Sequence, residues 1–143
     1  MPEESERALV GKLKAVPLFS SMNEKQLKTV IAGGKQQSYP EGRAIVREGE
    51  MGVAFYLILE GSAEVRHKGR LLAKLGSGNF FGEMSLLDNN PRSSDVVAAA
   101  PTRCLVLSSW EFQGLVEQNK DIAMGLLKAL THRLRESNKG LSD

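Results

Sequence analysis

The sequence predicts an α+β fold that is mainly β, in which a barrel or sandwich of short strands lies between N-terminal and C-terminal helices. Seven glycines separate short apolar runs between positions 42 and 78, which is typical of many short strands joined by tight turns. Apolar residues at helical spacing occur before position 34 and after position 108. The length of 143 residues suits one domain with its own core.

Two helices are expected at the start of the chain. Ser5 can cap the first, and Pro17 ends it. Asn23 and Gln26 have the spacing of a capping box for the second, which Gly34 ends. The apolar faces of these helices consist of Leu9, Val10 and Leu13 in the first, and Leu27, Val30 and Ile31 in the second.

The central region is predicted to form strands. The run AFYLILEG, at residues 54–61, is apolar on both alternating faces, as in a strand that is covered on both sides. Lys68 and Gly69 separate two short runs, which indicates a β-hairpin, and residues 100–102 form a second turn. Cys104 lies in the apolar run RCLVL and is expected to be buried.

The end of the chain is predicted to be helical again. Ser108 and Glu111 have the spacing of another capping box, and a break is expected near Asn119. A final helix then runs to about Ser137. Its apolar stripe consists of Ile122, Leu126, Leu127, Leu130 and Leu134.

Composition argues against several classes of function. The 19 basic and 17 acidic side chains nearly balance, so no nucleic-acid partner is expected. One cysteine and two distant histidines favour neither a disulfide framework nor a metal site, and no Ser/His/Asp arrangement suggests an enzyme. A signal peptide and an apolar run of membrane-spanning length are both lacking in the sequence, which favours a cytoplasmic protein without a membrane segment.

The stretch FGEMSLLDNNPRSS, at residues 81–94, has the chemistry of a sugar-phosphate site. Gly82 precedes a short helical turn, whose first N–H groups attract an anion, and glycine allows a ligand to approach the backbone. Arg92 can donate two parallel hydrogen bonds to a phosphate, and Ser93 adds a hydroxyl donor. Glu83 would repel that phosphate and is better suited to accept from a ribose hydroxyl.

The same stretch resembles the phosphate-binding cassette of cyclic-nucleotide-binding domains. The resemblance extends over about residues 12–136, because the glycines upstream and the helices downstream stand in register with the cassette. It implies an eight-stranded β roll, which is a jelly-roll-like double-stranded β-helix. One domain, 1–143, would then hold N-terminal helices at 5–33, the roll at 35–108 with its cassette at 81–96, and closing helices at 109–137.

The resemblance also implies a ligand site and the role of each residue in it. Glu83 would accept from the ribose 2′-OH, Arg92 would pair with the cyclic phosphate, and Ser93 would contact the phosphate or a guanine amine. Two residues depart from the family pattern. Asp95 stands where the family often has Thr or Ser, and strand alternation directs its side chain away from Arg92. Asn79 stands where the family frequently has Asp. The implied ligand-binding residues are Phe81, Gly82, Glu83, Met84, Ser85, Arg92, Ser93 and Ser94.

The sequence therefore predicts a sensor of cyclic AMP or cyclic GMP that is not an enzyme and needs no other cofactor. Ligand would reposition the C-terminal helix, with Arg133 or Arg135 covering the base, and this helix could contact a second copy or an effector protein. The alternative is an interaction or scaffold module of the same fold that no longer holds a nucleotide. The sequence does not decide between the two bases, although cyclic AMP is the first choice. It also leaves open the effector, the oligomeric state, and whether the chain is a standalone protein or an excised domain.

Overall fold

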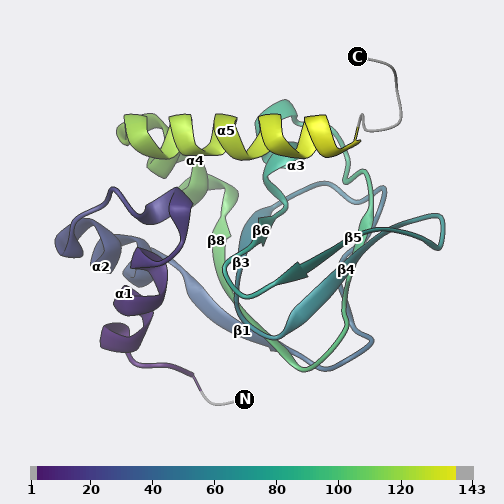
Figure 1. Cartoon of the computed structure of the whole chain (residues 1–143), viewed down its shortest axis with the longest axis horizontal. Coiled ribbons are helices and arrows are strands. Elements are labelled where there is room, and N and C mark those ends of the chain that lie inside the picture. The colour runs from purple at the N-terminus through teal and green to yellow at the C-terminus, as the bar shows by residue number, and fades with distance from the viewer. Residues whose placement is uncertain (1–2, 138–143) are drawn as a thin grey trace.

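The computed structural model describes residues 3–137, so positions 1–2 and 138–143 of the expected domain lie outside the described residues. Helices occupy both ends of the chain and strands its middle, as the sequence predicts (Figure 1). In chain order the elements are α1 (Glu6–Lys14), the 3-10 helix η1 (Pro17–Phe19), α2 (Glu24–Gly33), β1 (Lys35–Tyr39), β2 (Ala44–Val46), β3 (Ala54–Glu60), β4 (Ser62–His67), β5 (Arg70–Gly76), β6 (Phe80–Phe81), α3 (Glu83–Asp88), β7 (Asp95–Ala98), β8 (Thr102–Ser108), α4 (Ser109–Gln118) and α5 (Lys120–Ser137).

The eight strands form two four-stranded antiparallel sheets, with the orders β1-β8-β3-β6 and β2-β7-β4-β5. Lys68 and Gly69 turn the β4–β5 hairpin with φ of 52° and 79°, the positive values that a two-residue turn of type I′ needs. In Figure 1, α1 and α2 lie on one side of the roll, and α5 crosses above β6 and overlaps α3 in this view. The predicted β roll between helices is confirmed.

Strand β3 separates two buried cores. Phe55 and Leu57 face the helices, whereas Ile58 faces the interior of the roll, and all three are 1% exposed. The predicted cover on both faces of residues 54–61 is thus found for 54–59, whereas Glu60 at the end of β3 is exposed. Cys104 of β8 is fully buried in the roll core, and burial raises the pKa of its thiol to about 12.

The predicted helix starts are confirmed, with one difference. Ser5 accepts from the Ala8 N–H, and Asn23 and Gln26 form a complete capping box. Ser108 accepts from the Glu111 N–H, but the Glu111 carboxylate lies against Gly33, where an added Cβ would come within 2.6 Å of it. Packing between α4 and α2 therefore takes the place of the second half of that capping box.

The predicted stripe of α5 is only partly correct. Ile122 and Leu126 are buried in the helical core, and Leu130 packs against it. Leu127 and Leu134, in contrast, are 58% and 61% exposed. Leu127 lies about 100° and Leu134 about 80° around the helix from Leu126, because successive residues are about 100° apart. Within residues 3–137, no helix combines the length and the apolar character needed to cross a membrane.

The break predicted near Asn119 lies at that residue, which alone separates α4 from α5. Asn119 has an extended backbone, with φ of −130° and ψ of 98°. Its side-chain amide donates to the Leu115 carbonyl at 2.9 Å. Asn119 thus ends α4 and lets α5 leave in a new direction across the roll.

Candidate functional site

A cavity of about 690 Å³ lies between the sheet that contains β4, β5 and β7, the strand β6, the helix α3 and the helix α5. Its apolar wall comes from inward-facing residues of the roll, and its polar end comes from the cassette. Arg133 lines the cavity as well, whereas Arg135 is exposed and does not line it. All eight residues predicted to bind the ligand line this cavity: Phe81, Gly82, Glu83, Met84, Ser85, Arg92, Ser93 and Ser94.

Gly82 sets the start of α3 through its conformation and its small size. Its φ of +93° lies in the left-handed region, where a Cβ is strained. A Cβ there would also lie 2.8 Å from Arg92 Nη1 and 3.0 Å from the Ala54 carbonyl oxygen. The turn and the close approach of Arg92 both require glycine.

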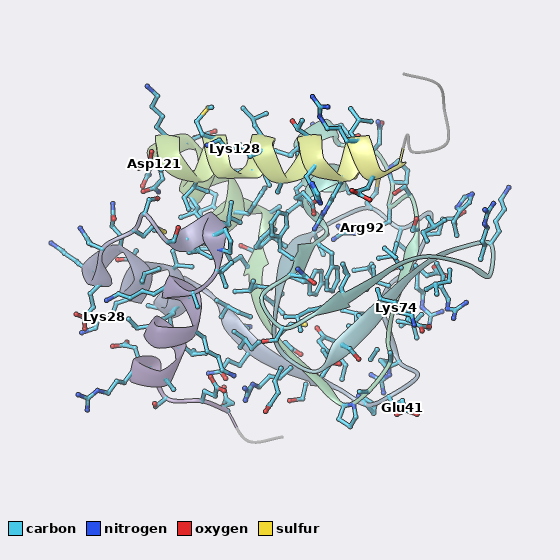
Figure 2. All side chains as sticks on the ribbon, in the orientation of Figure 1. Lys28, Glu41, Lys74, Arg92, Asp121 and Lys128 are labelled. Carbon is cyan, nitrogen blue, oxygen red and sulfur yellow. The ribbon has the colours of Figure 1, made fainter. Side chains whose placement is uncertain are left out.

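Arg92 is 7% exposed and is held inside the protein by its own guanidinium. Nη1 donates to the Gly82 carbonyl at 2.6 Å, and Nη2 donates to the Ala54 carbonyl at 2.8 Å. The guanidinium also lies 5.9 Å from the centre of the Tyr56 ring. Burial lowers the pKa of Arg92, and the neighbouring Tyr56 and Glu83 oppose that shift. In Figure 2, Arg92 lies on the side of the roll that α5 covers.

Glu83 is 1% exposed and forms an ion pair with Arg133 of α5. Arg133 also donates to the Phe80 carbonyl, and its guanidinium lies 4.6 Å from the centre of the Phe80 ring. Burial raises the pKa of Glu83; Arg133, a backbone N–H and Arg92 act in the opposite direction. The carboxylate that is predicted to bind ribose therefore already has a cationic partner on the last helix.

Ser85 joins α3 to the loop between β2 and β3. Its hydroxyl accepts from the Gly52 N–H at 2.9 Å and donates to the Asn90 carbonyl at 2.5 Å. A Cβ at Gly52 would lie 2.5 Å from Ser85 Oγ and 3.0 Å from Arg92 Cζ. The loop therefore packs directly against the cassette.

Asp95 does not line the cavity. Its carboxylate accepts from the Glu48 N–H at 2.7 Å, on the outer side of the cassette. The direction that strand alternation predicts for Asp95 agrees with this contact. Asn79, the other departure from the family pattern, lines the cavity and accepts from the Gly76 N–H at 2.8 Å.

Sequence reasoning missed two pairings at this site. It assigned Arg133 to the base and not to Glu83, although a buried carboxylate generally needs a cation or several donors. It also overlooked His67, whose Nδ1 lies 2.8 Å from Glu48 Oε1 and 3.2 Å from the Ser93 carbonyl oxygen. No local pattern connects these residues, because each pairing joins segments far apart in the chain.

Comparison with known proteins agrees with this geometry. The family model described as "Cyclic nucleotide-binding domain" matches residues 36–119. A cyclic AMP receptor protein of Thermus thermophilus is 34% identical over 131 residues, which cover 88% of this chain and 61% of that relative. This chain thus spans less than two thirds of that protein's length.

Two solved structures resemble the fold closely. One is a cyclic nucleotide-binding domain from Methylobacillus flagellatus, with a TM-score of 0.81, 28% identity, and coverage of 95% of this chain and 82% of that one. The other is the regulatory domain of Toxoplasma gondii PKA with cAMP, with a TM-score of 0.77, 26% identity, and coverage of 88% and 50%. The chain belongs to the cyclic-nucleotide-binding domain family.

Proposed function

We propose that this chain is a sensor domain that binds a cyclic nucleotide, with cyclic AMP as first choice over cyclic GMP. One observation carries the proposal: buried Arg92 and buried Glu83 line the same cavity, which also has an apolar wall that includes Val46, Val65 and Val96. A site for a purine cyclic nucleotide needs a cation for the phosphate, an acceptor for the ribose 2′-OH and an apolar wall for the base. A few placed polar groups in a mainly apolar cavity are typical of small-molecule sites.

Arg92 and Glu83 retain the capacity for these roles. A guanidinium has five N–H donors, and the two contacts to Gly82 and Ala54 use two of them, which leaves donors for the cyclic phosphate. A carboxylate has two oxygens and about four acceptor sites, so Glu83 can accept from a ribose hydroxyl in addition to Arg133 or in its place. The remaining predicted ligand residues, Phe81, Gly82, Met84, Ser85, Ser93 and Ser94, would form the rest of the site.

The proposal includes a movement of α5 on binding. Arg133 contacts Glu83 in this structure, so a ribose hydroxyl that reaches Glu83 changes the surroundings of this helix. Arg133 lines the cavity and is the better of the two predicted candidates for covering the base, because Arg135 lies outside the cavity lining. A ligand shifts the helix only if it binds the two helix positions unequally.

Calorimetric titration with cyclic AMP and with cyclic GMP tests the ligand. We expect saturable binding at one site per chain, and cyclic AMP should bind more tightly than cyclic GMP. The control 5′-AMP, whose phosphate is not closed into a ring, should bind weakly. A clear preference for cyclic GMP would reverse the choice of base. If neither cyclic nucleotide binds, the chain is instead an interaction or scaffold module of this fold.

Hydrogen exchange over residues 121–136 tests the movement of α5. We expect the exchange of these amides to change when cyclic nucleotide saturates the protein, while those of β3 and β8 in the core stay unchanged. Equal exchange of α5 in both states would contradict a moving helix and leave a rigid binding domain.

The outer face of α5 is the surface proposed to contact a partner. Met124, Leu127 and Leu134 are exposed on this helix, and a second copy or an effector protein is proposed to cover them. The activities of the longer relatives are not assigned to this chain. The absence of catalysis, the absence of a nucleic-acid partner and the cytoplasmic location stay predictions.

A further inference from the structure

The loop between β2 and β3 holds the backbone of Arg92 from both sides. The Arg92 N–H donates to the Glu50 carbonyl at 2.7 Å, and the Gly49 N–H donates to the Arg92 carbonyl at 2.9 Å. Gly49 has a φ of +88°, the left-handed conformation that bends the loop at this point. The position of Arg92 relative to the cavity therefore depends on the position of this loop.

Two side-chain contacts fasten the same loop to the roll, and a third joins β4 to the cassette. The Asp95 carboxylate of β7 accepts from the Glu48 N–H at 2.7 Å. The Glu48 carboxylate and the Ser93 carbonyl oxygen lie 2.8 and 3.2 Å from Nδ1 of His67, at the end of β4. Both partners of Nδ1 are acceptors, so this ring nitrogen carries a hydrogen. The contacts run from β7 to the loop, from the loop to β4, and from β4 back to the cassette.

Glu48, His67 and Asp95, here called the loop clamp, do not line the cavity. They cannot act on a ligand directly and act only through the residues that they hold. Asp95 stands where related cassettes often have Thr or Ser, and a carboxylate is a stronger acceptor for a backbone N–H than a neutral hydroxyl. The carboxylate of Asp95 therefore holds the Glu48 N–H more strongly than a hydroxyl at this position would.

We propose that Asp95 and His67 are positioning residues for phosphate binding: they hold the β2–β3 loop, and the loop holds Arg92. The proposal rests on the proposed role of Arg92. The side chains of Glu48 and His67 are 34% and 46% exposed, so each contact alone is weakened by solvent. We therefore expect single replacements to raise the dissociation constant by roughly threefold to tenfold.

Titration of cyclic AMP into Asp95→Ala and His67→Ala tests the effect on binding. Both variants should bind more weakly than the wild type, whereas Glu41→Ala, which removes an exposed carboxylate before β2, should bind equally well. Asp95→Asn keeps an acceptor oxygen and should recover most of the affinity. Adding Asp95→Ala to Arg92→Ala should cause little further loss of affinity for cyclic AMP, because the side chain that Asp95 is proposed to position is already absent. An equal loss in both backgrounds would overturn the proposal.

Amide exchange in the ligand-free protein tests the clamp without a ligand. The amides of Gly49 and Arg92 should exchange faster in Asp95→Ala and His67→Ala than in the wild type or in Glu41→Ala. Unchanged exchange, or faster exchange with unchanged affinity, would overturn the positioning role. A wild type that binds neither nucleotide would refute the proposed function, and the exchange rates alone would then decide whether the clamp holds Arg92.

Discussion

Replacement of Arg92 by alanine is expected to remove most of the affinity for cyclic nucleotide. The guanidinium is the cation proposed to meet the cyclic phosphate, and hydrogen bonds to charged groups contribute about 1.5–3 kcal/mol. The expected loss is therefore roughly tenfold to 150-fold in the dissociation constant. Calorimetric titration of the variant with cyclic AMP measures it, and unchanged affinity would exclude Arg92 from the phosphate role.

The same variant is expected to unfold more easily. Arg92 is buried and donates to the carbonyls of Gly82 and Ala54, so alanine leaves both acceptors without this partner and opens space beside Tyr56. The expected cost is about 1–3 kcal/mol in the free energy of unfolding. Arg92→Lys keeps the charge but not the planar pair of donors, so it should lie between wild type and alanine in both measurements. Denaturant unfolding separates this stability effect from the loss of affinity.

Replacement of Arg133 by alanine is expected to destabilise the protein most strongly at about neutral pH. Glu83 is almost completely buried, and the variant leaves its carboxylate without the cation on α5. Losing one partner of a fully buried pair costs about 3–5 kcal/mol. Arg133 is itself 38% exposed, so we expect a smaller cost, on the order of 1–3 kcal/mol.

The pH dependence of this effect follows from the direction of the Glu83 pKa. Burial raises the pKa in the folded state, so the folded protein binds this proton more tightly than the unfolded chain does. The resulting stabilisation is complete below the unfolded pKa and is lost as the pH rises through the folded pKa. Removing Arg133 takes away a lowering influence and raises the pKa of Glu83 further. The deficit of the variant should therefore shrink as the pH falls from about 7 to about 4.

Denaturant unfolding across this pH range, with two controls, distinguishes charge from packing. Arg133→Ala should cost little when Glu83→Gln is already present, because no buried carboxylate then remains. Arg135→Ala removes an exposed arginine from the same helix and should leave stability nearly unchanged. An equal cost of Arg133→Ala in both backgrounds would mean that its contacts with Phe80, and not its charge, stabilise the fold.

The sequence was most informative where function depends on neighbouring residues. Helix caps, the Lys68-Gly69 turn and the cassette are short patterns, so their positions could be predicted before the structure was known. Gly82 is an example, since its left-handed turn brings Glu83 and Arg92 to the same end of the cavity. All eight predicted ligand residues belong to the stretch 81–94 and line one cavity.

The sequence was least informative where distant segments meet. The Glu83–Arg133 pair depends on how far α5 is rotated, and helical spacing alone did not separate buried Leu126 from exposed Leu127. The burial of Arg92 is a further example, because the Ala54 carbonyl that accepts from its guanidinium lies in a strand 38 residues earlier in the chain. These contacts arise from the packing of whole elements, for which a single sequence contains no local signal.

In the proposed movement of α5, the extended residue between α4 and α5 would act as the pivot of a lever. This residue is Asn119, and the 18 residues of α5 extend about 27 Å from it. Arg133 lies about 21 Å along that arm, so a rotation of about 10° at the pivot moves it by about 4 Å. This displacement is larger than a hydrogen-bond length of about 3 Å. A small change in the backbone of one residue is therefore enough to separate Arg133 from Glu83.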